Sequence, residues 1–130
     1  MDDIEFMNIA LEEAEKALRE NEIPVGAVVV KDGKVISVGH NQRECLNDIT
    51  SHAEIEALKN AAKVLGSWKL NGCTLYVTLE PCLMCTGAIL QSRVSRVVFG
   101  AKDERDGALI SNYFVFDFFL RKFFKATNIC

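Results

Sequence analysis

The stretch CTLYVTLEPCLMC, residues 73–85, decides the fold class. Its first part, 73–79, is rich in β-branched and aromatic side chains, which predicts a strand. Glu80-Pro81 ends that strand, because proline lacks a backbone N–H and restricts the residue before it. A short helix is then expected from Cys82 to Ser92, followed by a further strand over 94–99. Helices that alternate with strands favour an α/β layered domain.

Upstream of that stretch, two adjacent strands are predicted. Residues 25–30 form a β-branched run too apolar to have a wet face, and residues 35–39 form the returning strand. Asp32-Gly33 lies between them and is typical of a hairpin turn, because these residues tolerate the positive φ that such turns require. Residues 40–50 are polar and are expected to form a loop.

Apolar residues recur at helical spacing in three further segments. The stripes expected to be apolar are Ile4, Met7, Leu11, Ala14 and Leu18 in the first, Ile55, Leu58, Ala62 and Leu65 in the second, and Phe116, Phe119, Leu120, Phe123 and Phe124 in the terminal segment. The second helix is expected to be capped by Thr50 or Ser51 and to end at Gly66. This alternation predicts helices on both faces of a sheet.

Length and composition favour one domain over residues 1–130, since 49% of the residues are hydrophobic and 25% are charged. No run approaches the ~18 apolar residues of a membrane span. The acidic start is unlike a targeting signal, so the cytoplasm is the expected location. The net charge of the chain is −3, but the acidic residues are concentrated in residues 1–22, which hold eight acidic and two basic residues. The rest of the chain is mildly basic, so the net charge does not exclude a nucleic-acid partner.

One pair among the five cysteines, Cys82-x-x-Cys85, has the spacing of a metal or redox site. At a helix start, this spacing points both sulfurs to one side, and His52 at another helix start would complete three protein ligands. Three ligands leave one position open for water, which is the arrangement of catalytic zinc. Glu54 lies in the same first turn as His52 and is the candidate general acid/base. We therefore expect one zinc ion per chain.

Each part of this pattern has a simpler explanation when taken alone. Ser51-x-x-Glu54 fits a capping box, in which the carboxylate only binds a backbone N–H. Cys82-x-x-Cys85 fits a redox pair, and a single histidine is often an ordinary helix-start residue. The combination of His-x-Glu with Pro-Cys-x-x-Cys about thirty residues later is far rarer than its parts, which favours the zinc site.

The signature HAE at 52–54 with PCLMC at 81–85 resembles that of the zinc nucleobase deaminases. The wider sequence, from about residue 5 to 108, is most similar to the bacterial tRNA-specific adenosine deaminases. The segments that carry this resemblance are IPVGAV at 23–28, GHN at 39–41, ND at 47–48, HAEI at 52–55, TLYVTLEPC at 74–82, SR at 92–93 and RVVFGA at 96–101.

That resemblance implies a cytidine-deaminase-like three-layer α/β/α sandwich with a central mixed sheet, and a homodimer. It implies hydrolytic deamination of adenosine to inosine at the wobble position of the tRNA anticodon, in which zinc-bound hydroxide attacks the base and Glu54 shuttles the proton. The partner is then the anticodon stem-loop. The residues that the resemblance places against the substrate are Asn41, Ala53, Asp103, Phe119, Arg121 and Lys122.

The sequence departs from this family at two places. Ile49 stands where the family usually has proline before Thr50, which is expected to loosen the loop ahead of His52. The chain after Ala108 is shorter than in the family and has no obvious fifth strand, although DFFLRK at 117–122 resembles the family's ending.

Other functions remain open on the same fold. A deaminase of a free nucleobase or nucleoside, such as cytosine, guanine or cytidine, needs the same zinc ligands and the same Glu54, so the zinc chemistry does not separate it from an RNA enzyme. The segment 39–41, the region of Asp103 and the basic tail favour RNA. A non-catalytic zinc-bound subunit is disfavoured because Glu54 is present, and a redox-active dithiol protein is a more distant alternative.

Overall fold

Helices and strands alternate along the part of the chain that the computed structural model describes, residues 2–109 and 111. In chain order they are α1 (Asp3–Arg19), β1 (Gly26–Lys31), β2 (Lys34–His40), α2 (Ala53–Leu65), β3 (Cys73–Leu79), α3 (Leu83–Ser92) and β4 (Arg96–Ala101). The α/β class is confirmed. Among the described residues, no helix is both long enough and apolar enough to span a membrane.

The strands form a single mixed sheet in the order β2-β1-β3-β4. β1 pairs antiparallel with both β2 and β3, whereas β3 and β4 are parallel. Asp32 and Gly33 make the predicted turn between β1 and β2, with positive φ values of 51° and 75°. α3 provides the crossover that parallel neighbours require.

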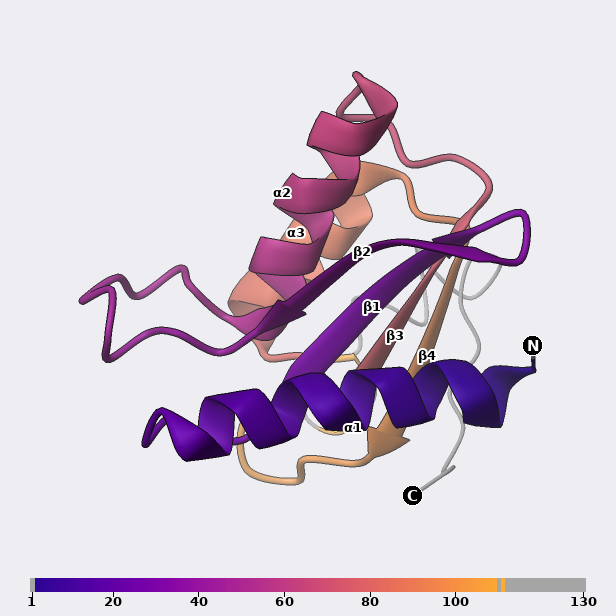
Figure 1. Ribbon diagram of the computed structural model, residues 1–130. Helices are drawn as coiled ribbons and strands as arrows, with labels where there is room; N and C mark the ends of the chain where they lie inside the picture. The colour runs from indigo at the N-terminus through magenta and orange to yellow at the C-terminus, as the bar shows by residue number, and fades with distance from the viewer. Residues whose placement is uncertain (1, 110, 112–130) are drawn as a thin grey trace.

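The helices cover both faces of this sheet, so the fold has three layers (Figure 1). Because side chains alternate along a strand, neighbouring residues of β1 enter different cores. Val28 packs with Phe6 of α1 on one face, while Val29 packs with Ala57 of α2 on the other. The predicted three-layer arrangement is therefore confirmed.

α1 packs on the sheet mainly through small side chains, and of the predicted stripe only Met7 and Ala14 are buried. The buried residues of α1 are Phe6, Met7, Ala10, Glu13, Ala14 and Ala17. Ile4, Leu11 and Leu18 are instead 58%, 38% and 60% exposed. Gly26 explains the choice of face, because a Cβ there would overlap the carbonyl oxygen of Ala10, so the backbones of helix and strand lie in contact.

The Gly26→Ala variant is expected to be destabilised by about 1–3 kcal/mol or more, because the added methyl group meets backbone atoms that cannot rotate away. Gly87→Ala is a matched control: no atom lies within 4 Å of its added Cβ, and alanine is the better residue inside a helix. Chemical denaturation of both variants measures the difference. Equal stability of Gly26→Ala and the wild type would contradict this close packing.

α2 begins later than predicted and uses a different cap. Its N-cap is His52, and no side chain makes a capping hydrogen bond there, so the predicted cap at Thr50 or Ser51 is wrong. Glu54 therefore does not belong to the proposed capping box. The helix ends as predicted at Gly66, which has a left-handed backbone with φ of 66°. A Cβ on Gly39 would lie 2.5 Å from the oxygen of Ala53, so β2 directly supports the first turn of α2.

β4 begins at Arg96, two residues later than the predicted strand over 94–99. Arg93 adopts a left-handed conformation after α3, with φ of 66°, and the chain needs Val94 and Ser95 to return to the sheet. Val94 is nevertheless buried in the core, which is why its apolar character resembled that of a strand residue. The questions of a fifth strand and a terminal helix concern residues outside the described part of the chain.

Candidate active site

Three side chains from two helix starts converge beside the sheet. His52 is the N-cap of α2, Cys82 is the N-cap of α3, and Cys85 lies in the first turn of α3. The Nδ1 atom of His52 lies 3.7 Å from the Sγ atom of Cys82 and 3.5 Å from that of Cys85. These donor atoms all lie within 4.8 Å of one another. The predicted cluster is therefore assembled in the fold.

The geometry of these donors fits zinc. With Zn–N near 2.1 Å and Zn–S near 2.3 Å, two ligands of a tetrahedral ion are separated by about 3.6 Å. The His52–Cys82 and His52–Cys85 separations of 3.7 and 3.5 Å match that edge length. One imidazole and two sulfurs are also a donor set that zinc prefers. Among the described residues, these three form the metal-binding group.

The two sulfurs lie in different electrostatic surroundings. A hydrogen bond from Cys85 lowers the pKa of Cys82 to about 4, and His52 also lowers it. The pKa of Cys85 is raised, first because its proton is shared with Cys82 and second because the side chain is buried. The surroundings of Cys82 therefore favour its thiolate, the form in which cysteine binds metal.

Glu54 is buried next to the three candidate ligands, with 4% of its surface exposed. Burial raises the pKa of its carboxyl to about 7, because the charged form loses its hydration. A carboxyl with a pKa near neutrality can both accept and donate a proton, which suits a general acid/base.

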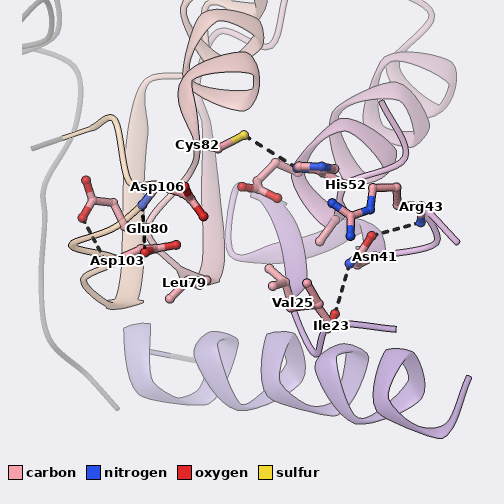
Figure 2. Close-up of a pocket in the computed structure, with 12 residues that line it drawn as sticks. Ile23, Val25, Asn41, Arg43, His52, Leu79, Glu80, Cys82, Asp103 and Asp106 are labelled. Atoms are coloured by element: carbon pink, nitrogen blue, oxygen red, sulfur yellow. Dashed lines mark hydrogen bonds between the residues drawn. The ribbon is translucent and has the colours of Figure 1, made fainter. Parts of the chain in front are cut away.

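A cavity of about 140 Å³ opens above this cluster. Its lining residues are Ile23, Val25, Asn41, Arg43, His52, Ala53, Glu54, Leu79, Glu80, Cys82, Asp103 and Asp106. Figure 2 shows the side chains of Asn41 and Arg43 on one side of the cavity, and Glu80, Asp103 and Asp106 on the other.

The first wall is the loop after β2. Asn41 is buried, and its Nδ2 donates to the carbonyl of Ile23 at 3.2 Å, while its Oδ1 accepts from the N–H of Arg43 at 3.0 Å. These bonds use one donor and one acceptor of the amide, which has two of each. A second donor and a second acceptor are therefore left for a substrate in the cavity.

The opposite wall is the loop after β4, and Glu80 organises it. This buried carboxylate accepts from the N–H of Asp103 at 3.1 Å and from the N–H of Ser111 at 2.9 Å. A Cβ on Gly107 would lie 2.5 Å from the Cδ of Glu80, so only glycine fits there. The loop is also joined to the ligand turn, since the N–H of Ala108 donates to the carbonyl of Pro81 at 2.8 Å.

The structure places most of the predicted site residues around one cavity. His52, Glu54 and Cys82 line it with Asn41, Ala53 and Asp103, and Cys85 completes the ligand cluster. The predicted contacts of Phe119, Arg121 and Lys122 lie outside the described residues. Glu22 and Glu80, which anchor the loops, were not predicted. For Glu80 the available signal was an acidic residue beside a proline at the end of a buried strand; for Glu22 no local signal was available.

The sequence matches the model of the cytidine and deoxycytidylate deaminase zinc-binding region over residues 1–101. The chain belongs to this deaminase family. It is 46% identical over 112 residues to the tRNA-specific adenosine deaminase of Aquifex aeolicus, covering 86% of this chain and 74% of that relative. Across bacterial relatives of this kind, the chain spans between 63% and 74% of their length.

Solved structures of deaminases share the fold. One comes from studies of A-to-I editing by tRNA:A34 deaminases at the wobble position of transfer RNA; it is 47% identical, with a TM-score of 0.81, covering 83% of this chain and 78% of that one. The guanine deaminase from Bacillus subtilis is 41% identical, with a TM-score of 0.76, covering 78% of this chain and 66% of that one. The cytidine-deaminase-like fold is therefore confirmed for this member of the deaminase family.

Proposed function

We propose that the chain is a zinc-dependent hydrolase that deaminates adenosine to inosine at the wobble position of a tRNA anticodon. The observation that carries this proposal is the His52-Cys82-Cys85 cluster with buried Glu54 beside one cavity. The similarity to tRNA-specific adenosine deaminases supports the choice of substrate. The similarity to a guanine deaminase makes a free base the second candidate.

The chain's own residues supply positioning and proton transfer. Zinc, when bound by His52, Cys82 and Cys85, supplies a Lewis acid that makes water nucleophilic near neutral pH. Glu54 takes a proton from the attacking water and delivers it to the departing amine, so ammonia is released and the base gains an oxygen. Asn41 presents its second donor and acceptor to the base or its ribose. Ala53, which is fully buried, shapes the floor of the cavity.

The proposal is tested by incubating the zinc-loaded full chain with an anticodon stem-loop RNA that carries adenosine at the wobble position. We expect inosine to form, and we expect much slower turnover of free guanine, cytosine and adenosine at equal concentration. The same RNA with adenosine only in the stem is the control. Rapid turnover of a free base without inosine formation in the RNA would favour the second candidate.

The proposal includes a homodimer, with the α2–α3 face as its interface. An apolar groove on this face is lined by Ile55, Leu58, Lys59, Ala62, Trp68, Leu70, Ala88, Gln91 and Ser92. Trp68 is 58% exposed, and Ile55 and Ala62 of the predicted core stripe lie on this outer face instead. Sedimentation is expected to give twice the 14.5 kDa mass of one chain, and Trp68→Glu is expected to give the monomer.

We also propose the zinc content, the domain organisation and the cellular location of the chain. One zinc ion per chain follows from one ligand cluster among the described residues. Residues 1–130 are proposed to act as one deaminase domain in the cytoplasm, where tRNA is found. Contacts of Phe119, Arg121 and Lys122 with the anticodon stem-loop stay a prediction.

A further inference from the structure

A second buried carboxylate, Glu22, lies outside the candidate metal cluster. It is 4% exposed and belongs to the connection between α1 and β1. Its Oε1 accepts from the N–H of Glu44 at 3.0 Å, and its Oε2 accepts from the N–H of Cys45 at 2.7 Å. Burial alone would raise its pKa, but the two amides, together with the Cys45 thiol and the charge of Arg43, bring the pKa below the ordinary value. Glu22 is therefore a buried negative charge that holds backbone N–H groups.

The backbone that Glu22 holds is the loop that forms one wall of the cavity. The loop leaves β2 beside β1, where the N–H of Asn41 donates to the carbonyl of Val25 at 3.1 Å. The side chain of Asn41 then binds the carbonyl of Ile23. The segment 22–25 thus contacts the loop at three successive points, and Glu22 makes the contact farthest from the sheet.

This arrangement fixes Arg43 as well as Asn41. The N–H of Arg43 donates to the Oδ1 of Asn41 at 3.0 Å, and the next two amides along the chain are the ones that Glu22 binds. Both Asn41 and Arg43 line the cavity. Removal of the Glu22 carboxylate would leave the partly buried N–H groups of Glu44 and Cys45 without their acceptor, and the loop would no longer be tied to the segment 22–25 at this point.

We propose that Glu22 is a positioning residue that sets the Asn41–Arg43 wall of the cavity and thereby determines which base the enzyme accepts. This inference rests on the proposed function. Glu22 acts through the loop, because its carboxylate binds the loop backbone at Glu44 and Cys45 and Glu22 is not among the residues that line the cavity. Since a misplacement of about 1 Å can cost about 100-fold in rate, a shifted wall is expected to impair substrate selection strongly.

The experiment compares the full chain with Glu22→Ala, Glu22→Gln and the control Glu20→Gln. Glu20 lies at the same end of α1, but its side chain is 43% exposed and binds the Nε2 of His40. Each protein is assayed with stem-loop RNA carrying adenosine or cytidine at the wobble position. Glu22→Ala is expected to raise KM for the adenosine RNA about tenfold or more and to lower the preference for adenosine over cytidine by a similar factor. Glu22→Gln, which keeps one acceptor, is expected to be intermediate.

A purely structural role would give a different pattern. Loss of folded protein alone lowers kcat equally for both RNAs and leaves KM and the preference for adenosine unchanged. That pattern, or wild-type kinetics in Glu22→Ala, would overturn the proposal. If Glu22→Ala does not fold, the same comparison is made between Glu22→Gln and Glu20→Gln.

Hydrogen exchange separates this inference from the proposed function, because it needs no substrate. The amides of Glu44 and Cys45 are expected to exchange at least tenfold faster in Glu22→Gln than in Glu20→Gln. Unchanged exchange would refute the positioning role even in an active enzyme. Faster exchange in a chain that deaminates no RNA would support the positioning role while the proposed substrate fails.

Discussion

Replacement of Glu54 by alanine is expected to lower kcat by about 10²–10⁴-fold or more, while the protein keeps its fold and its zinc. The reason is that Glu54 is the buried carboxyl beside the three candidate ligands, whereas the Glu80 carboxylate in the same cavity is bound to the amides of the opposite loop. The measurement is single-turnover conversion of wobble adenosine to inosine, with zinc content determined on the same sample.

Glu56→Ala is the matched control for this change. Glu56 lies in the same first turn of α2, but its carboxylate is directed to Lys59 at 4.0 Å. We expect this variant to remain fully active. If Glu54 served only as a helix cap, its loss would cost about 1 kcal/mol of stability and leave activity intact. An active Glu54→Ala enzyme would therefore remove the central residue of the proposed mechanism.

Replacement of Cys82 by serine is expected to abolish both zinc retention and turnover. Cys82 is the sulfur whose pKa is lowered to about 4, and a serine hydroxyl in its place does not ionise to a comparable ligand. Because the ligands come from two separate helices, the wild type is also expected to lose about 2.7 kcal/mol or more of stability when a chelator removes zinc supplied at 100 times its Kd.

Cys45→Ser provides the control, since Cys45 is an exposed thiol remote from the cluster. It is expected to retain wild-type zinc content by elemental analysis. Full zinc content in Cys82→Ser would exclude the three-ligand site. Loss of zinc in Cys45→Ser would indicate that zinc binding depends on thiols outside the proposed ligand cluster.

The ligand set and the sheet could be predicted because they depend on short segments with strong local signals. The Asp32-Gly33 turn, the β-branched run of β1 and the Pro81-Cys82 start of α3 each have a local physical cause. His52 and Glu54 could be assigned to the same site as Cys82 and Cys85, because zinc-dependent hydrolysis needs three ligands and a general acid/base. The alternation of strands and helices was then sufficient for the three-layer architecture.

The faces of the helices could not be predicted in the same way. Both α1 and α2 carry a stripe of large apolar residues and a second face rich in alanine. Apolar spacing favours the larger side chains, whereas close contact with Gly26 and Gly39 requires the smaller ones. These glycines lie on strands in another part of the chain. The spacing of apolar residues within one helix therefore does not predict which face of that helix packs on the sheet.

The loop anchors Glu22 and Glu80 were missed for a related reason. Each acidic residue stands next to a turn, where a solvent-exposed position is the usual expectation. Their burial depends on backbone N–H groups at 44–45 and at 103 and 111, more than twenty residues later in the chain. Only the assembled sheet brings those amides within reach.

The order of the strands has a consequence for how a newly made chain matures. β1 with β2, and β3 with α3 and β4, are two units that can form from neighbouring residues. Within the sheet they join where β1 pairs with β3, for example between Ala27 and Val77, and such distant pairing closes a long loop and is slow. His52 lies in the connection between the two units, while Cys82 and Cys85 lie in the second. We therefore expect the three ligand side chains to come together only when the two units pair, so that the metal site is completed late in folding.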